Sequence, residues 1–140
     1  MPKQPRTVLV VEDNADHALL MRLAARRIAR DLDVRIASNG REAVAYLAGD
    51  PPFTDRSHHP FPSLVILDLG MPLLDGFGVL SWIREQDGLG ELPVVVLTSS
   101  VNPTDQRRAR QGGARAFFTK PANMDDLGRT VEEIVERWLP

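Results

Sequence analysis

The chain has 140 residues, a formal net charge of −2, 43% hydrophobic residues and 26% charged residues. This length fits one domain over residues 1–140, and the composition argues against general disorder. There is no cysteine, which excludes disulfides, thiolate metal sites and cysteine nucleophiles. Apolar runs of about five residues are too short for a signal peptide or membrane span. Because the charge gives no electrostatic case for nucleic acid, we expect a cytoplasmic domain that binds neither membrane nor nucleic acid.

The first third of the chain predicts two strands, each followed by a helix. Residues 7–11 form an apolar run fit for a buried strand, and a helix capped by Asn14 or Asp16 is expected to run to about residue 30. Residues 34–36 predict a second strand, which precedes a helix that ends near Gly49. The side chains expected to point inward have helical spacing: Leu20, Ala24 and Ile28 on the first helix, and Ala43, Val44 and Leu47 on the second.

A long loop and three further strands are expected in the remainder. Residues 50–63 are rich in proline and turn formers, which interrupt helices and central strands, so we expect a surface loop there. Strands follow at 64–67, 94–97 and 116–119, with helices after Asp75, after Asn102 and from about residue 124 to 138. Alternation of this kind is typical of an α/β protein with a parallel sheet between two helical layers.

Polar side chains follow four of the expected strands. In chain order they are Glu12 and Asp13, Asp68, Thr98, and Lys120. Open parallel sheets bind ligands at the carboxyl ends of their strands. A five-stranded, flavodoxin-like (βα)5 sheet of order 2-1-3-4-5, in three layers α/β/α, would therefore bring these side chains into one polar site.

The expected site has the chemistry of phosphoryl transfer. Glu12, Asp13 and Asp68 would repel one another unless their pKa values rise or a cation binds, and all-oxygen ligands favour Mg²⁺ over Zn²⁺. Asp68 then has the surroundings of a carboxylate nucleophile toward phosphorus. The Thr98 hydroxyl and the Lys120 ammonium can stabilise charge on the transferred group.

Each of these residues also has an ordinary structural interpretation. An acid after a strand is commonly a turn former or helix cap, a threonine can be a cap, and a lysine at a strand end can lie along the surface. The joint occurrence of all five in this chain order favours the functional interpretation.

Four motifs give the chain a resemblance to a known family. They are residues 10–14 (VVEDN), 67–76 (LDLGMPLLDG), 97–99 (LTS) and 117–121 (FFTKP). In order and spacing the chain resembles the receiver domain of two-component response regulators over essentially its whole length. The resemblance implies a phosphorylation-activated signalling switch and not an enzyme that turns over a substrate.

The resemblance assigns a role to each polar residue at the strand ends. Asp68 is the expected phosphoacceptor, and the expected Mg²⁺ ligands, with Mn²⁺ as a substitute, are Glu12, Asp13, Asp68 and the Gly70 carbonyl. Small residues at Gly70 and Ser100 leave the phosphoryl lifetime undetermined, because many members carry there a side chain that affects the hydrolytic water.

The resemblance also implies a switch beside the phosphoacceptor. Thr98 is the expected switch hydroxyl, Lys120 the phosphoryl-binding lysine, and Phe117 an aromatic side chain whose rotamer is coupled to Thr98. Plain core packing is the alternative for Phe117. A cis peptide bond is implied between Lys120 and Pro121, and only X-Pro bonds adopt that isomer at modest cost.

Partners follow from the same resemblance. A histidine kinase is the expected phosphoryl donor, docking near Asp16, His17 and Leu20. We expect no output domain after the last helix, and therefore signalling through the surface of helix four, strand five and helix five, with homodimers formed there. The long loop and the start of the acid motif resemble a subgroup of stand-alone receivers found beside phytochrome histidine kinases, including bacteriophytochromes.

Three rival functions fit the same residues less well. An aspartate-nucleophile hydrolase or phosphomutase usually has a second Asp two residues after the nucleophile, where this chain has Gly70. A receiver regulated without phosphorylation is disfavoured because every reactive position is filled. Nucleotide binding lacks a glycine-rich phosphate loop after the first strand.

Two further features have ordinary surface interpretations. Arginines cluster on the first and fourth expected helices, and a solvated face is favoured for both groups: Arg22, Arg26, Arg27 and Arg30, and Arg107, Arg108 and Arg110. His58 and His59 are adjacent in the proline-rich loop and lack the spacing of metal ligands.

Overall fold

The computed structural model describes residues 6–140, in which five strands alternate with five helices. The strands are β1 (Thr7–Val11), β2 (Asp33–Ala37), β3 (Leu64–Leu67), β4 (Val94–Thr98) and β5 (Ala116–Thr119). They form one parallel sheet of order β2-β1-β3-β4-β5. The predicted fold class and strand order are therefore confirmed.

The helices are α1 (Ala15–Ile28), α2 (Gly40–Ala48), α3 (Gly76–Glu85), α4 (Pro103–Gln111) and α5 (Met124–Trp138). Each begins after an Asn or Asp whose side chain accepts a hydrogen bond from a backbone N–H of the first turn; these caps are Asn14, Asn39, Asp75, Asn102 and Asn123. Such caps satisfy N–H groups that have no partner within the helix. No helix in residues 6–140 has the length and apolar character needed to cross a membrane.

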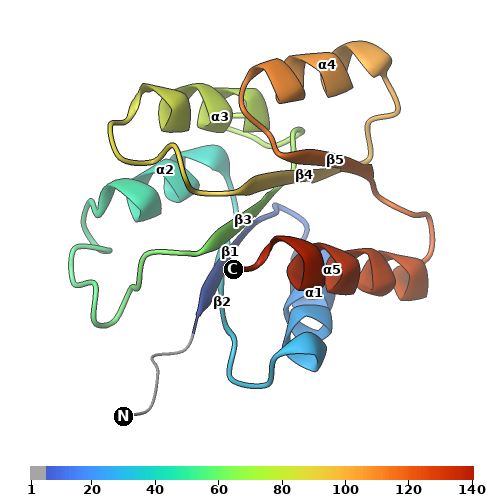
Figure 1. Ribbon diagram of the computed structural model, residues 1–140, viewed down its shortest axis with the longest axis horizontal. Coiled ribbons are helices and arrows are strands. Elements are labelled where there is room, and N and C mark those ends of the chain that lie inside the picture. Colours follow the sequence, from blue (N-terminus) through green and yellow to red (C-terminus); the bar gives the residue numbers. More distant parts are fainter. Residues whose placement is uncertain (1–5) are drawn as a thin grey trace.

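Helices cover both faces of the sheet (Figure 1). α1 and α5 pack side by side on one face, where the core includes Met21, Leu127 and Ile134. α2, α3 and α4 cover the other face, where the core includes Leu47 and Val79. The central strands β1, β3 and β4 are buried throughout, as expected for strands covered on both faces.

The buried stripe of α1 differs from the prediction. Ala24 is buried as expected, but Ile28 is 38% exposed and Leu20 is only half-buried. The buried positions are instead Ala18, Met21, Ala24 and Ala25. Small residues dominate because α1 packs closely on α5, where a Cβ added to Gly128 would lie 3.9 Å from the Ala24 Cβ. Hydrophobicity alone favoured the larger side chains, whereas close helix packing selects the alanines.

The loop between α2 and β3 is organised around Arg56. Its guanidinium donates hydrogen bonds to the Leu47 carbonyl (3.0 Å) and the His59 carbonyl (3.2 Å). The same group lies 5.6 Å from the ring centroids of Tyr46 and Phe61, within cation–π range. The predicted loop is thus present, and one arginine ties it to α2.

The start of α3 lies against the end of β3 through Gly76. A Cβ at Gly76 would lie 2.4 Å from the Asp68 carbonyl oxygen and 2.7 Å from the Leu69 Cα. Only a residue without a side chain allows this approach, so Gly76 helps to fix the backbone of Asp68. Gly70, two residues beyond Asp68, has open space around its Cα.

We expect Gly76→Ala to lower the free energy of unfolding by about 2 kcal/mol, because the new methyl group displaces backbone atoms. Gly70→Ala, which adds the same methyl group without a contact, should change it by less than about 1 kcal/mol. Urea denaturation of the two variants and the native chain measures both values. Equal stability of the two variants would show that α3 can move away from β3 without loss.

Candidate functional site

Three carboxylates meet where β1 and β3 end. Glu12 and Asp13 follow β1, and Asp68 follows β3, its neighbour in the sheet. One oxygen from each carboxylate lies within 4.8 Å of the others. Glu12 and Asp68 are buried, with 2% and 6% of their surface exposed, whereas Asp13 is exposed. The strand order has therefore brought the predicted acids together, and we call them the acid cluster.

Lys120 supplies the positive charge of the site. Its Nζ lies 3.0 Å from Asp68 Oδ2 and 2.5 Å from Glu12 Oε1, and its side chain is only 8% exposed. The Lys120 N–H donates to the Thr98 carbonyl (2.7 Å), which fixes the backbone beyond β5. One buried ammonium thus bridges carboxylates from two different strands.

Burial and charge shift two pKa values in this cluster. Burial raises the pKa of Glu12 above its ordinary value of 4.5, although the attraction of Lys120 opposes the shift. Burial acts to lower the pKa of Lys120, but its contacts with Glu12 and Asp68 outweigh that effect and raise the pKa above 10.5. Lys120 therefore stays charged at neutral pH, while ionised Glu12 is not fully compensated.

The residues of the acid cluster fit a hard divalent cation. Glu12 Oε1 is buried and accepts no hydrogen bond of normal geometry from residues 6–140, despite the close ion pair with Lys120. The cluster contains three carboxylates, and the Lys120 ammonium pairs with two of them, Glu12 and Asp68, which leaves negative charge in excess. The donors are oxygen atoms only, the ligand set that Mg²⁺ and Mn²⁺ prefer.

Thr98 and Gly70 line a pocket of about 360 Å³, together with Ser100 and Asp105. Thr98 is buried, with 3% exposed, and its Oγ1 accepts a hydrogen bond from the Ser100 N–H (3.4 Å). The Gly70 N–H donates to Asp68 Oδ1 (3.3 Å). The predicted switch hydroxyl and the predicted carbonyl ligand therefore lie at one edge of the sheet.

Phe117 is half-buried and packs on the core shared with α3 and α4. It pairs in register with Val96, two residues before Thr98. Side chains two residues apart on a strand point to the same face, so Phe117 and Thr98 share the face covered by α4. Phe118 packs on the opposite core.

His17 was predicted as part of a docking surface, but its side chain also reaches the acid cluster. Its Nδ1 lies 3.5 Å from Lys120 Nζ and 3.9 Å from Glu12 Oε1, and the side chain is 32% exposed. Its position in the first turn of the helix after the acid pair was the available signal. Of the other two predicted docking residues, Asp16 is exposed and Leu20 is half-buried against the core.

The prediction of a cis peptide bond between Lys120 and Pro121 is wrong: this bond is trans in the structure. In residues 6–140 the cis peptide bond lies at Pro51–Pro52. The trans isomer is the more favourable one for X-Pro bonds, and here it already allows Lys120 to reach both Asp68 and Glu12.

Several known proteins are similar to this chain in sequence and fold. Residues 8–132 match the response regulator receiver domain family. FilR2, a probable methanogenesis regulatory protein of Methanothrix harundinacea (strain 6Ac), is 38% identical over 137 residues, which cover 98% of this chain and 86% of FilR2. The response regulator Rcp1 of Synechocystis sp. is 32% identical over 135 residues, which cover 96% of this chain and 90% of Rcp1.

Two solved structures of response regulators have the same fold as this chain. The Mn²⁺-bound form of Rcp1 matches with a TM-score of 0.87 at 32% identity, covering 96% of this chain and 95% of that one. The phosphorylated cyanobacterial phytochrome response regulator RcpA matches with a TM-score of 0.90 at 32% identity, covering 96% of this chain and 94% of that one. The chain therefore belongs to the response regulator receiver domain family, whose members act in phosphorylation-dependent signalling.

Proposed function

We propose that this protein is a signalling switch that accepts a phosphoryl group from a histidine kinase onto Asp68. The observation that carries the proposal is the contact of Lys120 Nζ with Asp68 Oδ2 (3.0 Å) in a cluster with two further acids. This arrangement offers a nucleophile, a fixed positive charge and a set of oxygen ligands at one edge of the sheet.

The transfer itself exchanges one bond to phosphorus for another. A carboxylate oxygen of Asp68 attacks phosphorus and forms the P–O bond, while the bond from phosphorus to the imidazole nitrogen of the donor phosphohistidine breaks. The electron pair of that bond returns to the imidazole. Lys120 then stabilises charge on the transferred oxygens, because its ammonium is already fixed beside Asp68.

Glu12, Asp13 and Asp68, with the Gly70 carbonyl, would bind the divalent cation. Mg²⁺ is the proposed ion, and the Mn²⁺-bound structure of Rcp1 supports a divalent site in a relative. When bound, the cation neutralises negative charge between the carboxylates and the incoming phosphoryl group. The excess of carboxylates over ammonium groups is the feature of this chain that favours binding.

Thr98 and Phe117 would transmit the change to the surface. The Thr98 hydroxyl can donate to a phosphoryl oxygen on Asp68, because both residues lie at adjacent strand ends of β4 and β3. Ser100, which is linked to Thr98 by its N–H, donates to Asp105 of α4 (2.7 Å). A shift of Thr98 therefore has a direct connection to α4, and the altered surface would be that of α4, β5 and α5.

A phytochrome is the proposed class of kinase partner. The support is the similarity to RcpA, which is a phytochrome response regulator, over 96% of this chain. As in other receiver domains, the chain would promote its own phosphorylation and dephosphorylation without turning over a metabolite.

The phosphoacceptor is tested by intact mass after incubation with Mg²⁺ and acetyl phosphate. We expect the native chain to gain the mass of one phosphoryl group, and Asp68→Asn to gain none because the amide cannot act as the nucleophile. Asp75→Asn is the matched control: Asn caps α3 as well as Asp does, so its phosphorylation should be retained. Transfer to Asp68→Asn, or none to a folded native chain, would contradict the assignment.

The charge balance of the acid cluster predicts an effect of Glu12→Gln on stability. The folded-state pKa of Glu12 is raised, so its contribution to stability is fully present below the unfolded value and is lost as the pH rises through the folded pKa. At about pH 8, with a chelator present to remove divalent cations, the Glu12→Gln variant should therefore have a higher free energy of unfolding than the native chain, in which Glu12 is ionised. At about pH 4 the difference should shrink, because that pH lies below the ordinary Glu12 pKa of 4.5 and most Glu12 side chains are then protonated in both the folded and the unfolded state.

Urea denaturation at the two pH values measures this difference, with the exposed Glu136→Gln as control. Mg²⁺ should stabilise the native chain more than Glu12→Gln, since binding to the folded state raises its stability. A variant less stable than the native chain at the higher pH would show that attraction to Lys120 outweighs burial.

Homodimer formation through α4, β5 and α5 completes the proposed function. β5 is an edge strand, and the neighbouring Val101 is 82% exposed and Met124 41% exposed. Light scattering should give the mass of two chains, and Val101→Asp should lower it, because a charge there opposes apolar contact. A monomeric mass both with and without phosphorylation would remove this part of the proposal.

A further inference from the structure

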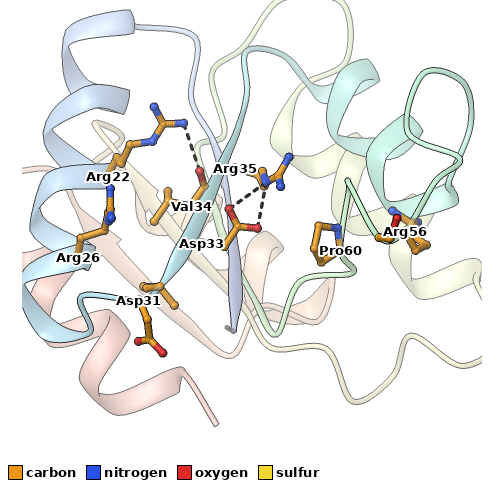
Figure 2. Close-up of a pocket in the computed structure, with 10 residues that line it drawn as sticks. Arg22, Arg26, Asp31, Asp33, Val34, Arg35, Arg56 and Pro60 are labelled. Carbon is orange, nitrogen blue, oxygen red and sulfur yellow. Dashed lines mark hydrogen bonds and ion pairs between the residues drawn. The ribbon is translucent and has the colours of Figure 1, made fainter. Parts of the chain in front are cut away.

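A groove of about 1040 Å³ follows the free edge of β2. α1 forms one wall and the loop of residues 50–63 forms the other, with Arg22 and Arg26 on the first wall and Arg56 on the second (Figure 2). Arg35 rises from β2 between them. We call this the β2 groove; no residue that lines it belongs to the acid cluster.

The β2 groove carries positive charge that the residues described by the structure, 6–140, do not neutralise. Within residues 6–140, Arg22, Arg26 and Arg56 form no ion pair with a carboxylate, and their guanidinium groups donate to backbone carbonyls instead. Asp33 is paired with Arg35 at 3.0 Å. The side chain of Asp31 points away from the arginines at one end of the groove (Figure 2). The floor and walls therefore favour an anionic ligand.

The β2 edge along the groove also offers backbone groups that no neighbouring strand uses. Asp33 donates its N–H to the Arg6 carbonyl, and the Ala37 carbonyl accepts from Glu12, so these alternate residues face β1. In a parallel pair the intervening residues, Val34 and Ile36, turn their backbone groups to the open edge. The Arg22 side chain confirms this orientation, because it donates to the Val34 carbonyl (3.2 Å). Such an edge is a template for an added strand.

We propose that the β2 groove binds an extended acidic segment of a partner protein, which adds as a sixth strand beside β2. Successive side chains of a strand point to opposite faces. Adjacent acidic residues would therefore reach Arg22 and Arg26 on the α1 side and Arg35 and Arg56 on the loop side. On binding, Arg22 exchanges its hydrogen bond to the Val34 carbonyl for a carboxylate of the segment, which frees that carbonyl for the added strand. Main-chain hydrogen bonds to Val34 and Ile36 then supply affinity, and the arginines select carboxylates.

Charge distinguishes this partner from other occupants. A second copy of the chain joined through its own β2 edge would bring the same arginines face to face, which is repulsive. A nucleic acid would bring closely spaced phosphates to Asp31 and Asp33 as well as to the arginines, and the chain has a net charge of −2. Carboxylates spaced along a strand can avoid the two aspartates.

The binding test uses a short, blocked, fluorescein-labelled peptide in which pairs of glutamates alternate with single threonines. Fluorescence anisotropy at low ionic strength measures its affinity for the full chain, because salt screens surface charges. We expect saturable binding that is lost when every glutamate is replaced by glutamine. Amide hydrogen exchange should show new protection at the Val34 and Ile36 N–H groups.

Arg26→Glu is the matched variant, because Arg26 is exposed and its hydrogen bond in the described chain goes only to the Arg30 carbonyl (3.4 Å). This substitution should lower the affinity for the peptide roughly tenfold. Arg107→Glu carries the same charge change on exposed α4, outside the groove, and should leave binding unchanged. Circular dichroism and phosphorylation by acetyl phosphate verify that both variants are folded.

Backbone N-methylation of the peptide separates strand addition from simple charge attraction. We expect the methylated peptide to bind much more weakly, since it cannot donate to the β2 edge. Four outcomes would each overturn the proposal. The methylated peptide could bind as tightly as the unmethylated one, or inorganic phosphate or a short DNA strand could compete as well as unlabelled peptide. The peptide could also bind Arg26→Glu with unchanged affinity, or could fail to bind the native chain. Phosphorylation at Asp68 is measured separately, so its failure would not be confused with failure of the groove.

Discussion

The buried ammonium of Lys120, between the carboxylates of Asp68 and Glu12, is the interaction on which the functional edge of this molecule depends. It joins residues that follow β5, β3 and β1, and it partly compensates the burial of two acids that water can barely reach. A buried ion pair is weak evidence for stability, because desolvation offsets attraction. Its value here is chemical: the cluster retains unsatisfied negative charge, which suits it to a cation and an incoming phosphoryl group.

The fold supplies this cluster through its strand order. Parallel strands end at the same edge, and order β2-β1-β3-β4-β5 makes β1 and β3 neighbours although they are far apart in the chain. Gly76 allows α3 to approach the Asp68 backbone. Thr98 and Phe117 then share the face covered by α4. A change of charge at Asp68 is therefore next to the elements proposed to respond.

Charge is divided between separate regions of the surface. Acids meet at the carboxyl ends of β1 and β3, whereas arginines collect along the β2 edge, three of them without a carboxylate partner in residues 6–140. The small net charge of −2 conceals this separation. The composition therefore argued against a general attraction to nucleic acid, but it could not predict a local basic groove. Arg22, Arg35 and Arg56 come together only when α1, β2 and the loop of residues 50–63 fold.

The elements and the polar residues that follow the strands could be predicted from the chain alone, because short apolar runs, Asn and Asp caps and polar strand ends are local signals. The strand order was an expectation of the fold class, since local signals do not say which strands pair. The sequence did not determine which face of α1 is buried: alanines replace Ile28 there because α1 packs closely on α5. Nor did it show His17 beside Lys120, the trans bond before Pro121, or the arginines of the β2 groove. These features depend on distances between segments remote in the chain, and only tertiary packing decides such distances.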